Sequence, residues 1–124
     1  MSVRGVGVDV ADIERMAAAL RRTPTLAGKL FTAGELSTRT GHRRGAASLA
    51  ARFAAKEAVA KVLERADRGW RLTDIEVVTA MSGRPTLSVG GRLAQRACAL
   101  GITTWHLSLS HDHGTAIAVV VAEG

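Results

Sequence analysis

Hydrophobic and polar residues alternate at the start of the chain and predict a β-strand over residues 3–10. Successive side chains of a strand point to opposite faces of its sheet. Val6, Val8 and Val10 therefore share one face, while Asp9 shares the other with the glycines of Gly-Val-Gly-Val-Asp-Val. The strand is expected to have one apolar face and one face of small residues that ends in a carboxylate.

Apolar residues then recur at helical spacing, which predicts four helical segments. They span residues 12–22, 25–38, 46–65 and 91–100. Asp12 has a side chain suited to cap the first segment. Gly28 and Gly34 are expected to break the second, and Gly101 to stop the fourth. The alanine-rich third segment predicts one long helix in the middle of the chain.

Alternation returns in the second half of the chain and predicts four more strands. They cover residues 73–79, the neighbourhood of Leu87 and Val89, residues 104–111 and residues 115–122, with loops expected at 38–46 and 66–71. Ser-Gly-Arg-Pro at 82–85 is a hairpin turn signal. The predicted order is β-α-α-α-β-β-α-β-β. This order indicates one α+β domain over residues 1–124, with a mostly antiparallel sheet packed on the long helix.

Composition adds a charge imbalance to this picture. The 124 residues include 17 basic and 11 acidic side chains, which give a net charge of +6, and 14 of the basic residues are Arg. A GC-rich genome explains such an excess, and so does an acidic or phosphate-rich partner. The single Cys98 suits a reducing compartment, and no apolar run approaches a membrane span. We therefore expect a soluble, cytoplasmic protein.

Candidate chemistry centres on Asp9, Glu57 and Lys61. Glu57 and Lys61 lie one turn apart on the long predicted helix, within Lys-Glu-Ala-Val-Ala-Lys. Two carboxylates and an ammonium group, if the fold brings them together, suit a Mg²⁺-bound phosphate. A simpler interpretation also stands: Asp9 satisfies local amides, and Glu57 and Lys61 form an ordinary helix pair worth about 0.2–0.5 kcal/mol.

The turn after the fourth predicted strand holds a second set of polar residues, Ser110, His111 and Asp112. Ser110 and His111 point to opposite faces of a strand and do not form a catalytic triad. His111 shares a face with apolar residues, which is typical of a core histidine. Asp112 is either a proton acceptor or a turn residue. The four His and one Cys lack zinc-site spacing.

Basic residues gather on the first predicted helix. Arg15 and Arg22 lie seven residues apart on one face, with Arg21 beside it, opposite Ile13 and Leu20. This face is either simply solvated or a docking surface for an acidic helix.

Taken together, these segments resemble the holo-acyl-carrier-protein synthases, the short trimeric branch of the 4′-phosphopantetheinyl transferases, and the composition looks actinobacterial. The resemblance covers nearly the whole chain. It rests on Gly5-Val6-Gly7-Val8-Asp9, Phe31-Thr32-Ala33-Gly34-Glu35, Arg52-Phe53-Ala54-Ala55-Lys56-Glu57-Ala58 with Lys61, Asp74-Ile75-Glu76-Val77, Gly83-Arg84-Pro85 and Ser108-Leu109-Ser110-His111.

The resemblance implies a set of residue roles. Asp9 and Glu57 would bind Mg²⁺ together with the pyrophosphate of coenzyme A, and Lys61 would neutralise phosphate charge. The remaining implied contacts are grouped by partner: Arg52, Ser110 and His111 for coenzyme A, Arg84 and Pro85 for its adenine side from a neighbouring subunit of a homotrimer, and Arg15, Arg21 and Arg22 for an acidic carrier protein.

The implied reaction moves the phosphopantetheine arm of coenzyme A to a carrier-protein serine and releases adenosine 3′,5′-bisphosphate. Glu57 is the implied proton acceptor, and Asp112 is its rival. Fatty-acid, polyketide and peptide-synthase carriers all remain open. The alternatives are a Mg²⁺-dependent phosphate-ester hydrolase that uses the same acids and a basic nucleic-acid-binding module. The second lacks an aromatic platform, and we expect neither nucleic acid nor membrane as a partner.

Overall fold

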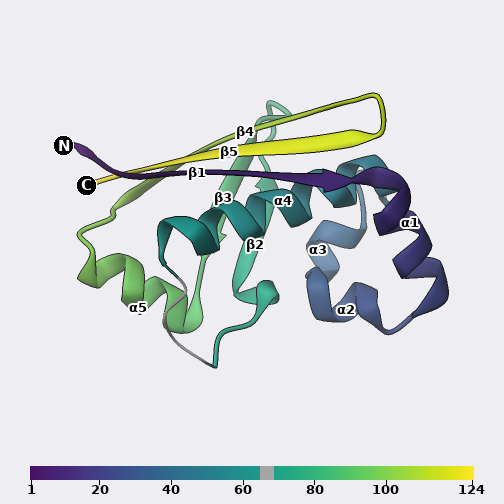
Figure 1. Ribbon diagram of the computed structural model, residues 1–124, viewed down its shortest axis with the longest axis horizontal. Coiled ribbons are helices and arrows are strands. Elements are labelled where there is room, and N and C mark those ends of the chain that lie inside the picture. Colours follow the sequence, from purple (N-terminus) through teal and green to yellow (C-terminus); the bar gives the residue numbers. More distant parts are fainter. Residues whose placement is uncertain (65–68) are drawn as a thin grey trace.

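A computed structural model describes residues 1–64 and 69–124 of the chain (Figure 1). Its elements are β1 (Val3–Asp12), α1 (Ile13–Arg22), α2 (Leu26–Leu30), α3 (Ala33–Leu36), α4 (Ala46–Val62), the 3₁₀ helix η1 (Leu72–Asp74), β2 (Ile75–Thr79), β3 (Pro85–Val89), α5 (Gly91–Ala99), β4 (Thr104–Asp112) and β5 (Thr115–Glu123). The predicted order of helices and strands is confirmed, except that the second predicted helix is divided into α2 and α3. Part of the loop expected at 66–71 lies outside the described residues.

The strands form two antiparallel sheets. One has the order β1-β5-β4, and the other pairs β2 with β3. In Figure 1 the first sheet forms a layer along α4, with α1, α2 and α3 at one end of that helix and α5 toward the other. The α+β class with antiparallel neighbours is therefore confirmed, and α4 is the element against which the rest of the chain packs.

The face of β1 that carries the glycines lies directly on α4. A Cβ atom on Gly7 would stand 2.3 Å from the carbonyl oxygen of Ala58, and one on Gly5 would stand 2.9 Å from Cγ1 of Val62. Only glycine fits so close to another backbone. The two contacts also show that β1 runs antiparallel to α4, since Gly5 contacts a later turn of the helix and Gly7 an earlier one.

Small residues make up much of the core. The inward-facing residues of β5 are Ala116, Ala118, Val120 and Ala122, all fully buried, and they meet the alanines of α4. An alanine-rich helix can approach a sheet closely, so the core is filled although aromatic residues are scarce.

Three helix boundaries differ from the sequence prediction. The segment 25–38 divides at Phe31 and Thr32, and Gly28 and Gly34 lie inside helices α2 and α3. The division falls there because Phe31 is 1% exposed and Thr32 caps α3 in a capping box with Glu35. The long helix ends at Val62, and residues 72–74 are a 3₁₀ turn. None of the described helices is long and apolar enough to span a membrane.

The apolar face of β1 points out of the single chain. Val6, Val8 and Val10 are 64%, 49% and 59% exposed. They stand directly across from Val121, Val119 and Ile117 of β5. The outer surface of this sheet is therefore a continuous apolar patch, the kind of surface that marks an interaction site.

Candidate functional site

The site forms where β1 crosses α4. The Nζ of Lys61 donates hydrogen bonds to Oδ1 of Asp9 and to the carbonyl oxygen of Val8, both at 2.9 Å. The Lys61 side chain is 49% exposed and that of Asp9 is 21% exposed. An ion pair this open to solvent contributes little to stability. Its two charges can therefore be repartnered with a ligand at small cost.

Glu57 lies one helical turn before Lys61, on the same side of α4. Gly7 abuts Ala58, and Asp9 is the next residue on that face of β1. Because β1 runs antiparallel to α4, Asp9 lies toward the earlier turns of the helix, in the direction of Glu57. The fold thus joins Asp9 to Lys61 in one ion pair, and Glu57 lies one turn of α4 from that lysine.

The donor set at this junction suits Mg²⁺. Carboxylate oxygens are the hard ligands that Mg²⁺ takes, usually one or two of them together with water and substrate phosphates. In the described parts of the chain, no cluster of three or more His, Cys, Asp or Glu could hold a metal ion. A metal ion at Asp9 and Glu57 would therefore depend on the phosphates of a ligand to complete its coordination.

Ser110 and His111 lie on β4, which β5 separates from β1. Ser110 pairs with Ile117, which in turn pairs with Val10, so Ser110 belongs to the outer apolar face. Asp9 belongs to the inner face. His111 is exposed at the strand end. Within one chain these two residues do not join the Asp9 junction, and their contact with coenzyme A stays a prediction.

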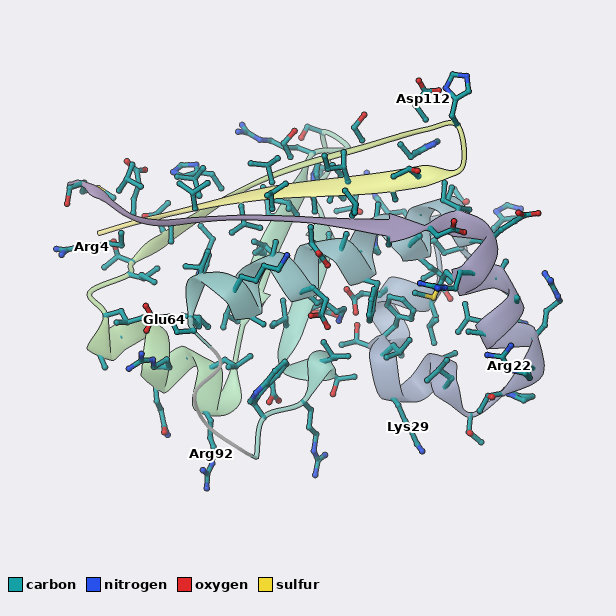
Figure 2. All side chains as sticks on the ribbon, in the orientation of Figure 1. Arg4, Arg22, Lys29, Glu64, Arg92 and Asp112 are labelled. Carbon is teal, nitrogen blue, oxygen red and sulfur yellow. The ribbon has the colours of Figure 1, made fainter. Side chains whose placement is uncertain are left out.

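Asp112 occupies the tip of the β4–β5 hairpin. Its side chain is 84% exposed, and its Oδ1 lies 2.9 Å from Nδ1 of His113. Figure 2 shows it pointing away from the molecule. Its register partner Thr115 pairs with Asp12, three residues beyond Asp9. One chain does not bring Asp112 to the junction, and its role as proton acceptor remains a prediction.

Arg52 lies on α4 but faces the second sheet. It is 5% exposed and donates to Oγ of Ser48 at 2.6 Å and to Oγ1 of Thr79 at 3.0 Å. Its Nε is buried without a hydrogen-bond partner among the described residues. Burial, and then the nearby Arg44 guanidinium, lower the pKa of Arg52 to about 10. An anion placed here would relieve both costs.

Arg84 and Pro85 lie close to the same sheet edge. Pro85 is the register partner of Thr79, which accepts a hydrogen bond from Arg52. Arg84 is exposed in the turn before it. Arg52, Arg84 and Pro85 thus lie around Thr79 on β2, apart from the Asp9–Lys61 pair on β1 and α4.

The basic residues of α1 are exposed, as predicted. Arg15 borders a cleft of about 370 Å³ whose other walls are mostly apolar. Its lining includes Val10, Asp12, Met16, Leu26, Leu30 and Phe53. Arg21 borders a different cleft on the other side of α1, and Arg22 projects from the end of the helix (Figure 2). Because Val10 and Asp12 closely follow Asp9, the Arg15 cleft adjoins the candidate site.

Sequence reasoning assigned no role to Lys56 and Glu35, which form a buried ion pair. Their side chains are both 0% exposed, and Nζ of Lys56 lies 2.7 Å from Oε1 of Glu35. Burial lowers the pKa of Lys56, and its hydrogen bond to Glu35 acts in the opposite direction. The signal was available: Lys56 follows Leu49 by two helical turns on a buried stripe, and a charge there needs a partner.

Comparisons with known proteins show what the whole chain is similar to. The chain matches the family model of the 4′-phosphopantetheinyl transferase superfamily over residues 5–120. It is 60% identical over 124 residues to a holo-[acyl-carrier-protein] synthase of Streptomyces coelicolor, with 100% of both chains covered.

Solved structures of similar proteins share the fold. A holo-[acyl-carrier-protein] synthase from Neisseria meningitidis gives a TM-score of 0.85 at 30% identity, covering 99% of this chain and 100% of that one. The Helicobacter pylori protein, solved in complex with coenzyme A, gives 0.81 at 25% identity, covering 96% and 100%.

Proposed function

The chain belongs to the 4′-phosphopantetheinyl transferase superfamily and is an enzyme of the holo-[acyl-carrier-protein] synthase type, and we propose that it transfers the arm of coenzyme A to a serine hydroxyl of an apo acyl carrier protein with the help of Mg²⁺. Coenzyme A-dependent phosphopantetheine transfer is the activity of the family. The Asp9–Lys61 pair beside Glu57 carries the finer proposal.

The reaction exchanges one P–O bond for another. The serine oxygen attacks the phosphorus on the pantetheine side of the pyrophosphate, and the bond from that phosphorus to the bridging oxygen breaks. The leaving group is adenosine 3′,5′-bisphosphate. Bound Mg²⁺ would supply charge stabilisation to the pyrophosphate oxygens. Asp9 and Glu57 would hold the ion.

Two residues of the junction act on charge and proton during this exchange. The Lys61 ammonium, half exposed and one turn from Glu57, can turn from Asp9 to a phosphate oxygen, where it stabilises the negative charge that develops. Glu57 accepts the serine proton, directly or through a water molecule. Such chemistry depends mainly on positioning and electrostatics.

We infer that the chain acts as a homotrimer with sites between subunits. The apolar surface around Val8 needs a cover, and Asp9 and Thr79 lie on different sheets of one chain. A neighbouring subunit would supply the missing part of each site: Ser110 and His111 toward the phosphates, Arg84 and Pro85 toward the adenine. Arg52, with its unpartnered Nε, suits a phosphate of coenzyme A.

The cleft beside Arg15 suits the carrier protein. Its apolar lining offers a seat for an apolar side chain of a carrier helix, and Arg15, Arg21 and Arg22 would face acidic residues on that helix. The position of the cleft next to Asp9 would bring the carrier serine to the phosphates. Reduced Cys98 and the substrate coenzyme A are in keeping with a cytoplasmic location.

Intact-mass measurement of an apo acyl carrier protein tests the proposal. The carrier is incubated with coenzyme A, Mg²⁺ and the wild-type chain, with and without EDTA. We expect a metal-dependent gain of one phosphopantetheine arm on the carrier. Release of adenosine 3′,5′-bisphosphate without any carrier would favour the hydrolase alternative. No reaction with several apo carriers would contradict the proposal.

Sedimentation tests the assembly. Wild type is expected to sediment as a trimer, and Val8→Lys as a monomer, because a charge in the apolar patch cannot be buried unpaired. Val78→Lys is the matched control, since Val78 is 41% exposed on the other sheet and its replacement should leave the trimer intact. An active wild-type monomer would contradict sites between subunits.

A further inference from the structure

The buried pair of Lys56 and Glu35 connects the long helix to three other segments. The Lys56 ammonium has three N–H donors, and all three are used. It donates to Oε1 of Glu35, to the carbonyl oxygen of Leu72 at 3.0 Å, and to the carbonyl oxygen of Ile75. Lys56 therefore joins α4 to α3, to η1 and to the start of β2.

Glu35 is satisfied as completely as its partner. Its Oε1 also accepts from the backbone nitrogen of Thr32 at 3.0 Å, and its Oε2 accepts from the backbone nitrogen of Val77 at 2.9 Å. The two side chains thus form a cluster with no unused polar group, and such a cluster has a single preferred geometry.

This cluster holds α4 on the side opposite to the glycine contact. On one side the Ala58 carbonyl meets Gly7 of β1 with no room for a Cβ atom. On the other, Lys56 grips the carbonyls of the η1–β2 segment. Contacts on both sides within one helical turn fix the rotation of α4 about its axis.

The geometry points to a positioning role, and we propose that the Lys56–Glu35 pair sets the rotation of α4 so that Glu57 and Lys61 face Asp9. Glu57 is the next residue after Lys56, and Lys61 follows one turn later, so any rotation of the helix moves both. Catalytic groups need placement to about 0.5 Å and 10–20°. This inference rests on the proposed function, because it concerns the same site.

A purely stabilising role predicts a different outcome from a positioning role. Replacement of a buried ion pair by apolar residues of similar volume is often neutral or stabilising. An enzyme in which Lys56 and Glu35 are both apolar should therefore fold. If the pair acts only on stability, that enzyme works normally, whereas if the pair positions α4, it folds but works poorly.

The decisive experiment compares Lys56→Met/Glu35→Leu with wild type and with Lys29→Met, a matched replacement of an exposed lysine on α2. The readouts are the melting temperature, kcat and KM for coenzyme A and carrier, and Mn²⁺ affinity by electron paramagnetic resonance. We expect the double variant to fold with a lowered melting temperature, because the backbone nitrogens of Thr32 and Val77 lose their acceptor, and to keep its KM for the carrier. Its kcat and its Mn²⁺ affinity should each fall about 10–100-fold, the range for groups that orient metal ligands. Lys29→Met should match wild type.

Wild-type kcat and Mn²⁺ affinity in a folded double variant would overturn the inference. If the double variant does not fold, Glu35→Gln decides: reduced kcat and Mn²⁺ affinity in folded protein support positioning, and a lowered melting temperature alone overturns it. Failure of the proposed function would look different, because wild type itself would then transfer nothing. The Mn²⁺ comparison would still test the positioning role.

Discussion

Helix α4 carries two lysine–carboxylate pairs five residues apart, and they live in opposite environments. Lys56 and Glu35 lie 2.7 Å apart with both side chains 0% exposed. Lys61 and Asp9 lie 2.9 Å apart with side chains 49% and 21% exposed. The two pairs have the same chemistry and nearly the same distance, so whatever separates them comes from their surroundings.

Burial decides how easily each pair can exchange partners. The inner pair, Lys56 and Glu35, also forms hydrogen bonds with backbone groups of three segments. Removal of one charge would leave the other in a medium that cannot solvate it. The outer pair, Lys61 and Asp9, is partly exposed, so water solvates both charges. A phosphate or metal ion can therefore compete for Lys61 and Asp9 but not for Lys56 and Glu35, which suits one pair to fixing the helix and the other to binding a substrate.

Removal of each lysine in turn gives the largest expected difference. Lys56→Met should lower the free energy of unfolding by about 3–5 kcal/mol, because Glu35 keeps its charge in the core. Lys61→Met should change it by less than about 1 kcal/mol. Denaturant unfolding of both variants measures the contrast. Equal losses at the two positions would contradict the assignment of different roles.

Removal of the carboxylate charge of Asp9 or of Glu57 should lower the activity rather than the stability of the fold. Asp9→Asn and Glu57→Gln are each expected to lower kcat/KM by at least about 10²-fold, the scale for loss of one electrostatic group at a transition state. Both variants should melt close to wild type, since neither carboxylate side chain is fully buried. Carrier transfer assays at several Mg²⁺ concentrations measure the loss. Full activity of either variant would exclude that carboxylate as an essential metal ligand.

The contact that lets β1 reach the outer pair can be tested at Gly7. Gly7→Ala would place a Cβ atom 2.3 Å from the Ala58 carbonyl oxygen, so the strand must shift. The expected cost is about 1–3 kcal/mol of stability, with loss of activity as Asp9 moves. Gly28→Ala, which meets nothing within 4 Å, is the control and should stabilise α2 by about 0.4–1 kcal/mol. Similar behaviour of both variants would show that the close approach is unimportant.

Most of the fold follows from periodicity in the sequence. The strand and helix patterns predicted the order of elements, and the Asp12 cap is present, with its Oδ1 accepting from the backbone nitrogen of Arg15 at 2.8 Å. The boundary within 25–38 was wrong because it was placed at glycines. A buried Phe31 and a capping box at Thr32 decided it instead. The burial of Phe31 depends on tertiary contacts, whereas the Thr-x-x-Glu capping box is a local signal that the sequence prediction did not use.

The site was predictable only in part. The contact between Asp9 and Lys61 joins two of the three residues that the sequence singled out, and Glu57 follows from its helical spacing to Lys61. The buried stripe of α4 marks Lys56 as a charge that needs a partner, but that partner, Glu35, lies 21 positions away, and no local pattern identifies it. Only the resemblance groups Ser110 with His111 at coenzyme A, since alternation along β4 puts the two side chains on opposite faces. That separation within one chain is a reason to expect a second subunit.

The smallest expected effect belongs to the rival proton acceptor. Asp112→Ala should leave kcat close to that of wild type. It should change the free energy of unfolding by no more than about 0.5 kcal/mol, as for most surface substitutions. The side chain is 84% exposed and contacts His113. Strand β5 separates Asp112 from β1, and the β1 residue at the same register position is Asp12 rather than Asp9. A subunit partner could still bring it to a neighbouring site, so steady-state kinetics should be measured on the assembled trimer. A large fall in kcat there, with unchanged KM for the carrier, would transfer the role of proton acceptor from Glu57 to Asp112 and leave Glu57 as a metal ligand alone.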